Sequence, residues 1–126
     1  MPLTVAGRVE EDIGILELSG TLTTGPWLVE VRQKARQLFE AQKLKGLIVV
    51  VGAITKNDTS GLGELTAVYS LASKQGCPIR LVGVRPDLRK VLELTRLDGI
   101  LPSASDIAAA KKDLKRNGPN AASMTA

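Results

Sequence analysis

Apolar and polar residues alternate at the start of the chain. From Leu3 to Val9 every second residue is apolar or glycine, and the run IGILEL (13–18) forms another strand-like segment after the acidic residues 10–12. A period of two is typical of a half-buried strand, and short polar stretches between such runs are typical of turns. The segment therefore predicts a β-hairpin.

Helical and strand patterns follow the hairpin. Apolar residues recur at helical spacing from 28 to 43, and Thr24 is the expected N-cap of this helix. The β-branched run LIVVV (47–51) predicts a strand covered on both faces. A helix with Leu65 on its apolar side comes next and ends at Gly76.

The same alternation continues in the second half of the chain. It predicts a strand over 78–84, a helix opening at Pro86, a last short strand over DGILP (98–102), and a final helix over 103–116 capped by Ser105 or Asp106. The order β-β-α-β-α-β-α-β-α predicts an α/β fold. We expect a mixed β-sheet with an N-terminal hairpin followed by βαβ units, and about four helices packed against the sheet.

Length and composition indicate a single domain with an aliphatic core. The chain has 126 residues and only three aromatic side chains, so leucine, valine, isoleucine and alanine must fill the interior. The C-terminal stretch NGPNAASMTA has little apolar material to pack. We therefore expect a folded domain over 1–113 and a disordered tail over 114–126.

The charged and reactive residues exclude several functions. The net charge of +4 is spread thinly, and aromatic stacking platforms are scarce, so a nucleic-acid partner is not expected. With no histidine and a single cysteine, a serine triad, a disulfide and the common zinc sites are excluded, and no cofactor is expected. The N-terminus has no signal-peptide pattern and no apolar run is long enough for a membrane span, which predicts a cytoplasmic protein without membrane insertion.

Hydroxyl residues and glycines stand between the buried strand and the helix that follows it, in NDTSGLGEL (57–65). As a helix start the segment is ordinary, because Asp, Thr and Ser are preferred N-caps and glycine allows close packing. As a phosphate-binding loop it lacks both G-x-x-x-x-G-K-[ST] and G-x-G-x-x-G. As a catalytic nucleophile, Thr59 or Ser60 would need a nearby base, and the chain has no histidine.

A fourth interpretation is that another protein acts on the hydroxyl. A threonine presented at a helix N-terminus, without internal catalytic groups, suits a kinase substrate. Phosphorylation adds about −1.5 to −2 charges, which the helix dipole and free backbone N–H groups partly stabilise. A folded site can thus accept the group while its outer surface changes sign.

The motif and its surroundings resemble a known family. DTSGLG (58–63), behind an IVVV strand and before an Ala-containing helix, is similar to the D-[ST]-[ST]-G-L-G signature of STAS domains, the anti-sigma-factor antagonists of bacteria. The resemblance covers residues 3–113. It includes LELSGTL (16–22), CPIRLVGVRPDLRKVLELTRLDGIL (77–101) and DIAAA (106–110).

The resemblance implies a regulatory binding module and not an enzyme. In that family the hydroxyl residue after the aspartate is the phosphoacceptor, here Thr59, and Ser60 is the candidate for a secondary acceptor. The unphosphorylated form binds an anti-sigma factor that is also a serine/threonine kinase, the kinase then phosphorylates the antagonist, and a protein phosphatase resets the cycle. The implied partner-binding surface comprises Lys56, Asn57, Asp58, Thr59, Ser60, Gly61, Leu62, Gly63 and Glu64.

The chain departs from the family pattern at several positions. The acceptor is usually serine, GTLTT (20–24) lacks an acid that the family has after its second strand, and Arg96 stands where glycine is frequent. An alternative function is therefore a subunit of a larger assembly, such as a stressosome-like scaffold or a transporter-associated STAS protein, in which the surface docks constitutively. A small-ligand or nucleotide sensor is a third, without a binding signature. The kinase, the pathway and the oligomeric state stay open.

Other conspicuous residues have structural interpretations. We expect Glu64 to complement the dipole of its own helix, Trp27 to cover the edge of the core, and Cys77 to be a packed thiol. The lysines of the final helix predict a solvated basic face.

Overall fold

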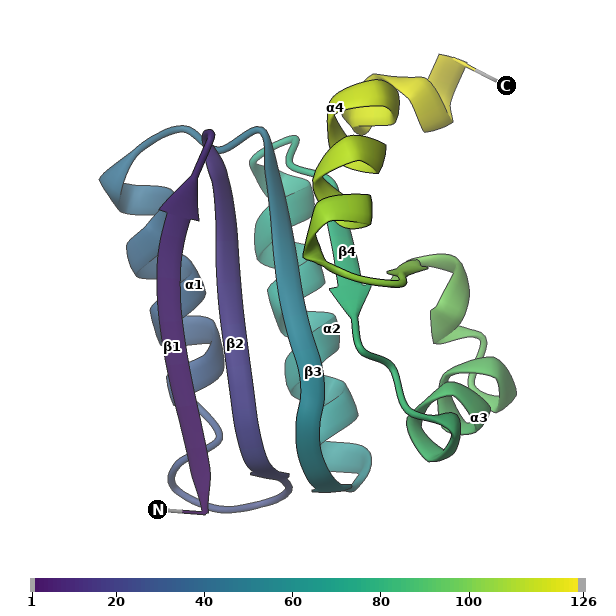
Figure 1. The fold of residues 1–126 in the computed structure, drawn as a ribbon. Helices are drawn as coiled ribbons and strands as arrows, with labels where there is room; N and C mark the ends of the chain where they lie inside the picture. Colours follow the sequence, from purple (N-terminus) through teal and green to yellow (C-terminus); the bar gives the residue numbers. More distant parts are fainter. Residues whose placement is uncertain (1, 125–126) are drawn as a thin grey trace.

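The computed structural model describes the backbone of residues 2–124 and the side chains of residues 2–116. Its strands are β1 (Leu3–Glu10), β2 (Ile13–Leu22), β3 (Gly46–Asn57), β4 (Ile79–Val82) and β5 (Ser103–Ala104). They form one sheet in the order β1-β2-β3-β4-β5, with β1 antiparallel to β2 and the later pairs parallel (Figure 1). The expected mixed sheet, a hairpin followed by βαβ units, is confirmed.

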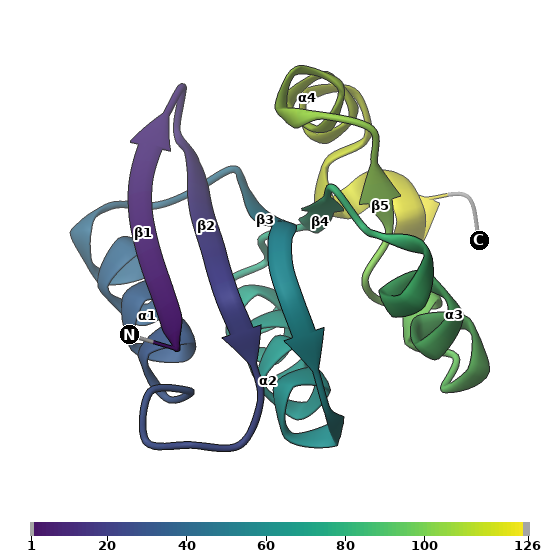
Figure 2. The same ribbon diagram turned by 60° about the horizontal axis from the view of Figure 1, so that its bottom comes forward.

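Helices cover both faces of this sheet. The helices are α1 (Glu30–Ala41), α2 (Thr59–Lys74), α3 (Pro86–Leu94) and α4 (Ile107–Met124), and a short 3-10 helix, η1 (Leu97–Gly99), follows α3. Helices α1 and α2 pack side by side behind β1, β2 and β3, whereas α4 lies across β3 and β4 on the opposite face (Figures 1 and 2). The chain therefore forms three layers where α4 is present.

The buried strand β3 divides the core between these faces. Leu47, Val49 and Val51 point into the main core under α1 and α2, while Ile48 joins a smaller cluster under α4. That smaller cluster consists of Ile13, Ile15, Ile48, Val82, Ala110 and Leu114. The apolar run 47–51 is thus buried on both sides, as its composition predicts.

The last strand does not form where it was expected. The segment DGILP (98–102) was predicted to be extended, but η1 occupies its start and β5 begins only at Ser103. The amides of Ile100 and Leu101 both donate to the carbonyl of Leu97, at 3.1 and 2.9 Å, so neither is available to a sheet partner. Leu101 is buried because it packs into the main core and not because it belongs to a strand.

Helix α4 has one of its two predicted caps, but it begins at Ile107, because residues 103–104 of the predicted helix form β5, and it continues beyond residue 116. Asp106 is its N-cap, since Oδ1 accepts a hydrogen bond from the amide of Ala109 at 2.7 Å. The backbone is helical to Met124, through the segment for which a disordered tail was expected, and residues 125 and 126 lie outside the described part. Leu114, the first residue beyond the expected boundary, is buried. The division of the chain near residue 113 stays a prediction.

Candidate functional site

The conspicuous motif lies where β3 passes into α2, at the carboxyl ends of β2 and β3. Leu22 and Asn57 are paired at this end of the sheet, and the amide of Asp58 donates to the carbonyl of Leu22 at 3.3 Å. Asp58 is extended, with φ −139° and ψ −175°, and its Oδ1 accepts from the amide of Gly61 at 2.9 Å. The predicted helix start is present, and Asp58 is its cap.

Thr59 and Ser60 differ although they are neighbours. Thr59 is the first residue of α2 and is exposed, and its hydroxyl has no hydrogen bond to any described residue. Ser60 is also exposed, but its Oγ accepts a hydrogen bond from the hydroxyl of Thr24 at 2.6 Å. A second protein can thus reach the Thr59 hydroxyl without first breaking an internal contact.

The carboxylate of Asp58 is held by two backbone amides. In addition to the bond from Gly61, its Oδ2 accepts from the amide of Thr24 at 2.9 Å. These two donors, Thr24 first, lower the pKa of Asp58 below its ordinary value. An acid with a lowered pKa and both oxygens occupied is a poor base for the neighbouring Thr59, which disfavours a nucleophilic role for that hydroxyl.

Thr24 does not cap α1, contrary to the expectation from its position. The helix begins at Glu30, and its N-cap position is Val29, which makes no side-chain capping bond. Thr24 instead joins the loop after β2 to the start of α2 through Asp58 and Ser60. Capping preference is local, whereas these partners are 34 and 36 residues away.

The side chain of Glu64, a residue of α2, accepts hydrogen bonds from the start of the neighbouring helix α1. It is 4% exposed, and its Oε2 accepts from the amide of Arg32 at 3.2 Å and from the Arg32 Nε at 3.1 Å. Arg32 is the third residue of α1, where backbone amides lack partners within the helix. Glu64 thus stabilises α1 and not its own helix, which corrects the expected dipole role.

The implied partner-binding surface is partly internal. Gly61, Leu62 and Glu64 are buried. An ideal Cβ built on Gly61 would lie 1.9 Å from the carbonyl oxygen of Leu22, so only glycine fits there. The residues that reach the surface are Lys56, Thr59, Ser60 and Gly63, with Asn57 and Asp58 half-buried.

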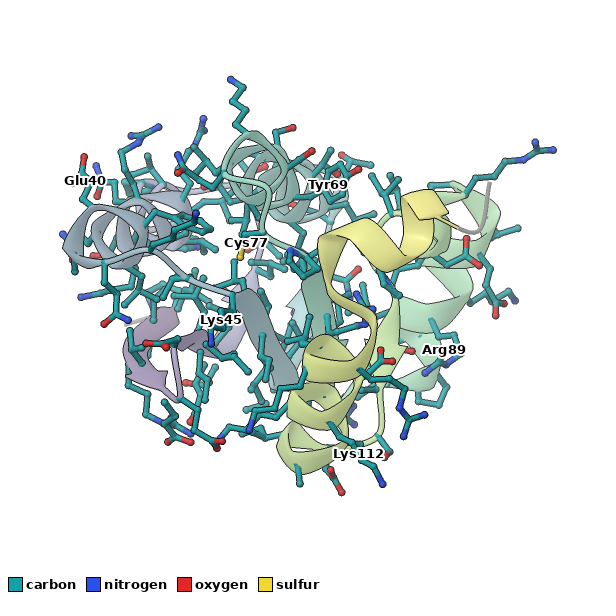
Figure 3. All side chains as sticks on the ribbon, turned by 90° about the horizontal axis from the view of Figure 1, so that it is seen from above. Glu40, Lys45, Tyr69, Cys77, Arg89 and Lys112 are labelled. Carbon is teal, nitrogen blue, oxygen red and sulfur yellow. The ribbon has the colours of Figure 1, made fainter. Side chains whose placement is uncertain are left out.

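The other residues noted in the sequence are mostly structural. Cys77 is buried and lies in the interior in Figure 3, and burial raises the pKa of its thiol to about 12, which makes it unreactive. Trp27 packs against the main core, as expected, although its Nε1 is buried without a hydrogen-bond partner among the described residues.

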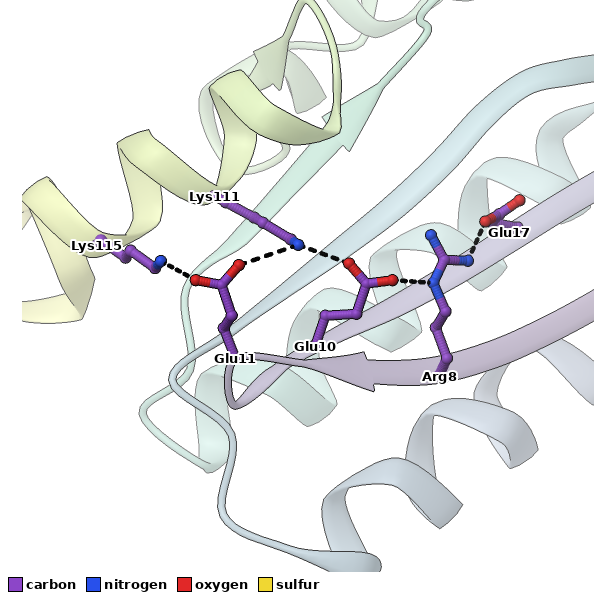
Figure 4. Close-up of polar contacts among 6 residues, drawn as sticks. All are labelled: Arg8, Glu10, Glu11, Glu17, Lys111 and Lys115. Carbon is purple, nitrogen blue, oxygen red and sulfur yellow. Dashed lines mark hydrogen bonds and ion pairs between the residues drawn. The ribbon is translucent and has the colours of Figure 1, made fainter.

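The lysines of α4 do not form a simple solvated face. Lys111 and Lys115 make ion pairs with Glu10 and Glu11 at the tip of the hairpin (Figure 4), whereas Lys112 points outward. Part of the predicted basic face therefore forms ion pairs that hold α4 to the hairpin, and is not simply solvated.

Two further properties of the described residues bear on function. Nowhere in that part of the chain do three His, Cys, Asp or Glu side chains gather into a group that could hold a metal ion. No helix within residues 2–124 combines the length and apolarity that crossing a bilayer requires.

Comparison with known families agrees with the fold and the motif. A family model described as the STAS domain matches residues 5–110, which is most of the chain. The chain belongs to the STAS domain family. No protein of curated function matches its sequence.

Solved structures share this STAS fold at low sequence identity. An anti-sigma factor antagonist from Mycobacterium paratuberculosis superimposes with a TM-score of 0.71 at 19% identity, over 90% of this chain and 94% of that one. The anti-sigma factor antagonist SpoIIAA in its unphosphorylated form gives 0.65 at 18% identity, over 90% and 97% of the two chains. A chain of the stressosome, described as a signal integration and transduction hub, gives 0.66 at 20% identity, over 88% and 96%.

Proposed function

We propose that this STAS domain is a non-enzymatic, cytoplasmic anti-sigma-factor antagonist, switched by phosphorylation of Thr59. The partner is an anti-sigma factor that is also a serine/threonine kinase, and a protein phosphatase removes the phosphate. Binding of the unmodified antagonist to the kinase releases the sigma factor for transcription, and phosphorylation ends that binding.

One observation carries the proposal. Of the two adjacent hydroxyls in the family motif, that of Thr59 is exposed and makes no hydrogen bond to a described residue, whereas that of Ser60 is bonded to Thr24. A kinase must bring the acceptor oxygen in line with its nucleotide, and an exposed hydroxyl at the first residue of a helix meets that requirement. The same difference favours Thr59 over Ser60 as the principal acceptor.

The chemistry is supplied by the kinase. The Thr59 Oγ attacks the γ-phosphorus of ATP bound to the kinase, the bond from that phosphorus to the β–γ bridging oxygen breaks, and ADP leaves. The hydroxyl proton passes to a base of the kinase. Because Asp58 stays ionised beside Thr59, the new phosphate adds to a charge already present, and the local surface becomes strongly negative.

A change of this kind alters partner binding through complementarity. A partner surface that fits the unmodified helix start, which carries only the Asp58 charge, is opposed by about 1.5 to 2 further negative charges at the same place. Like charges brought together at an interface disfavour binding of that partner. Lys56, which is exposed next to the motif, is the nearest cation in sequence and a candidate to contact the phosphate.

The test is phosphorylation with purified components. The protein is incubated with ATP and each candidate kinase encoded in the same genome, and phosphate is located by mass spectrometry. We expect phosphate on Thr59, its loss in Thr59→Ala, and its retention in the matched control Ser70→Ala, which removes an exposed hydroxyl further along α2. Ser60→Ala shows whether a secondary acceptor exists.

Binding measurements separate the switch from a constitutive assembly subunit. We expect Thr59→Ala to bind the kinase at least as tightly as the wild type, and Thr59→Glu to bind more weakly. Equal affinity of these variants, together with no labelling by any kinase, would favour the alternative of a subunit in a larger assembly.

A further inference from the structure

Two hydrogen bonds join the loop after β2 to the residues on either side of Thr59. We call residues 23–29 the Trp27 loop. Its Thr24 donates from the backbone amide to Asp58 Oδ2 at 2.9 Å and from the hydroxyl to Ser60 Oγ at 2.6 Å. The proposed acceptor thus lies between the two anchor points of a separate segment.

The Trp27 loop is a compact unit of its own. The amide of Leu28 donates to the carbonyl of Gly25 at 3.1 Å, and the amide of Glu30 donates to the carbonyl of Trp27 at the same distance. The indole lies directly over Gly25, where an ideal Cβ would fall 2.2 Å from the ring. Trp27 and Leu28 pack against the main core, so the hydrogen bonds of Thr24 are the contacts by which the start of the loop is held to α2.

The loop also contains an unsatisfied polar group. The Trp27 Nε1–H is buried and has no hydrogen-bond partner among the described residues. Such groups are rare in folded proteins, because a buried donor without a partner has lost its water. Next to it, Val29 is 40% exposed although it is a large apolar residue. A rearrangement that brings an acceptor to the Nε1–H would satisfy this group.

We propose that negative charge on Thr59 releases the Trp27 loop from α2, with Asp58 and Thr24 as the positioning residues that make the loop responsive. The inference rests on the proposed function, since it names how phosphorylation of the same site is read. A partner kinase then detects a changed loop as well as a changed charge.

The physical reason is competition at the helix start. A phosphate on the first residue of α2 is attracted to the backbone amides of the first turn, and it competes with Asp58 for the amide of Gly61. It also repels the Asp58 carboxylate, whose other oxygen holds the amide of Thr24. Displacement of that carboxylate removes the bond to the Thr24 amide, so that of the two hydrogen bonds from Thr24 only the one to Ser60 is left.

The experiment needs no kinase. Because Trp27 is the only tryptophan of the chain, its indole N–H resonance and its fluorescence report on this loop alone. The variants Thr59→Glu and Thr59→Gln differ in charge and hardly in shape. We expect Thr59→Glu to shift the indole resonance and to speed hydrogen exchange of the Thr24 amide by about tenfold. Thr59→Gln should match the wild type in both.

A further variant tests the anchor directly. Thr24→Val keeps the backbone amide and the side-chain shape but removes the hydroxyl that donates to Ser60. In the otherwise unmodified protein it should speed exchange of the residue 24 amide, in the same direction as Thr59→Glu, without any new charge. Unchanged exchange in Thr24→Val would overturn the anchoring role of that hydroxyl.

Failure of this inference is distinguishable from failure of the proposed function. Equal protection of the Thr24 amide and an unchanged indole resonance in Thr59→Glu and Thr59→Gln would overturn loop release, even if a kinase labels Thr59. A charge-dependent loop response with no labelling by any kinase would support the loop mechanism and contradict phosphorylation.

Discussion

Gly61 shows how one position fixes the geometry of the motif. The backbone of Leu22 passes so close to it that a Cβ would meet the carbonyl oxygen at 1.9 Å. The contact is with the backbone of Leu22, which cannot shift to make room for a Cβ as the end of a flexible side chain can. We therefore expect Gly61→Ala to lower the free energy of unfolding by about 1–3 kcal/mol, the usual cost of overpacking. Urea denaturation followed by circular dichroism measures this.

The matched control lies two residues further along the same helix. A Cβ at Gly63 would meet nothing within 4 Å, and this position is exposed. Gly63→Ala should therefore raise the free energy of unfolding by about 0.5–1 kcal/mol, because alanine is the better helix former. Destabilisation of both variants by the same amount would contradict the close contact between Gly61 and β2.

Arg96 occupies a backbone conformation that favours glycine. It has φ 61° and ψ 20°, in the left-handed region, directly before η1. The left-handed conformation gives a physical reason why glycine is frequent at this position in STAS domains. We expect Arg96→Gly to be more stable than Arg96→Ala by about 1 kcal/mol, because only glycine enters this region without a steric cost. In the interior of an ordinary helix the alanine variant would be the more stable one. The difference in thermal unfolding midpoint between Arg96→Gly and Arg96→Ala therefore distinguishes the two cases by its sign.

Single-residue roles were predictable where their cause is local. Asp58 and Asp106 could be recognised as caps, since a capping side chain bonds to an amide three residues away in each case. Thr24 and Glu64 were misassigned for the opposite reason. Their partners come from other elements of the fold, and no preference within the surrounding sequence indicates them.

At the scale of elements, the hairpin and α4 are held together by a chain of ion pairs. Glu11 and Asp12 form the hairpin turn with φ of 55° and 64°, an unfavourable conformation for residues with side chains. Glu10 accepts from Lys111 Nζ at 2.6 Å, and Glu11 is paired with both Lys111 and Lys115 (Figure 4). The contacts fix a strained turn against the helix that covers it.

These contacts predict a dependence of stability on acid. Lys111 first, and Arg8 second, lower the pKa of Glu10 to about 2, and Lys115 with Lys111 lowers that of Glu11. A carboxylate with a depressed pKa stabilises the fold above its unfolded pKa, near 4.5, and this contribution is lost as the pH falls toward 2. Urea midpoints measured between about pH 6 and about pH 2 should fall over that window.

The assignment to Lys111 can be tested with its neighbour. Lys111→Met removes the ion pairs but keeps most of the aliphatic side chain, and it should flatten the acid dependence. Lys112→Met is the control, because Lys112 is exposed and has no ion pair among the described residues. An identical pH profile for the two variants would contradict the role of Lys111, and salt should weaken the wild-type effect because these side chains are partly exposed.

Helices and strands could be predicted where the apolar periodicity extends over many residues. The prediction failed where the apolar run is short. The hairpin, the buried strand β3 and the helices α1 and α2 each extend over many residues with one period. DGILP has only two large apolar residues, Ile100 and Leu101, and a short apolar run does not distinguish a strand from a packed turn. Helical hydrogen bonds to Leu97 decide the outcome there.

At the scale of the molecule, the two features that carry chemistry lie at opposite ends of β2. Its first residue, Ile13, follows the acidic turn paired with α4, and its last, Leu22, precedes the Trp27 loop and touches the start of α2. The two helix layers are separated by the sheet, so the α4 side has its own small apolar cluster. The fold class was predictable because element order and the motif agree independently, whereas this separation depends on which face each helix covers.

Because the sheet separates the two helix layers, we expect different effects when a buried leucine side chain is shortened to alanine in one layer or in the other. Leu65 is 1% exposed in the main core between α2 and the sheet. Leu114, on α4, is 3% exposed and lies against Gly46 of β3. Leu65→Ala should lower the global free energy of unfolding by roughly 2–5 kcal/mol and speed exchange throughout the main core. Leu114→Ala should speed amide exchange mainly in α4 while the Thr24 amide keeps its protection.

Hydrogen exchange with mass spectrometry measures both variants on one scale. The amides of the Trp27 loop and of α2 serve as the internal reference, since neither segment contributes a residue to the small cluster around Leu114. If Leu114→Ala instead exposed the Trp27 loop as much as α4, the two layers would unfold as one unit, and the proposed switch would then be coupled to the acid-sensitive contacts at the far end of the sheet. Independent exchange confines the response to charge on Thr59 to its own end of the molecule.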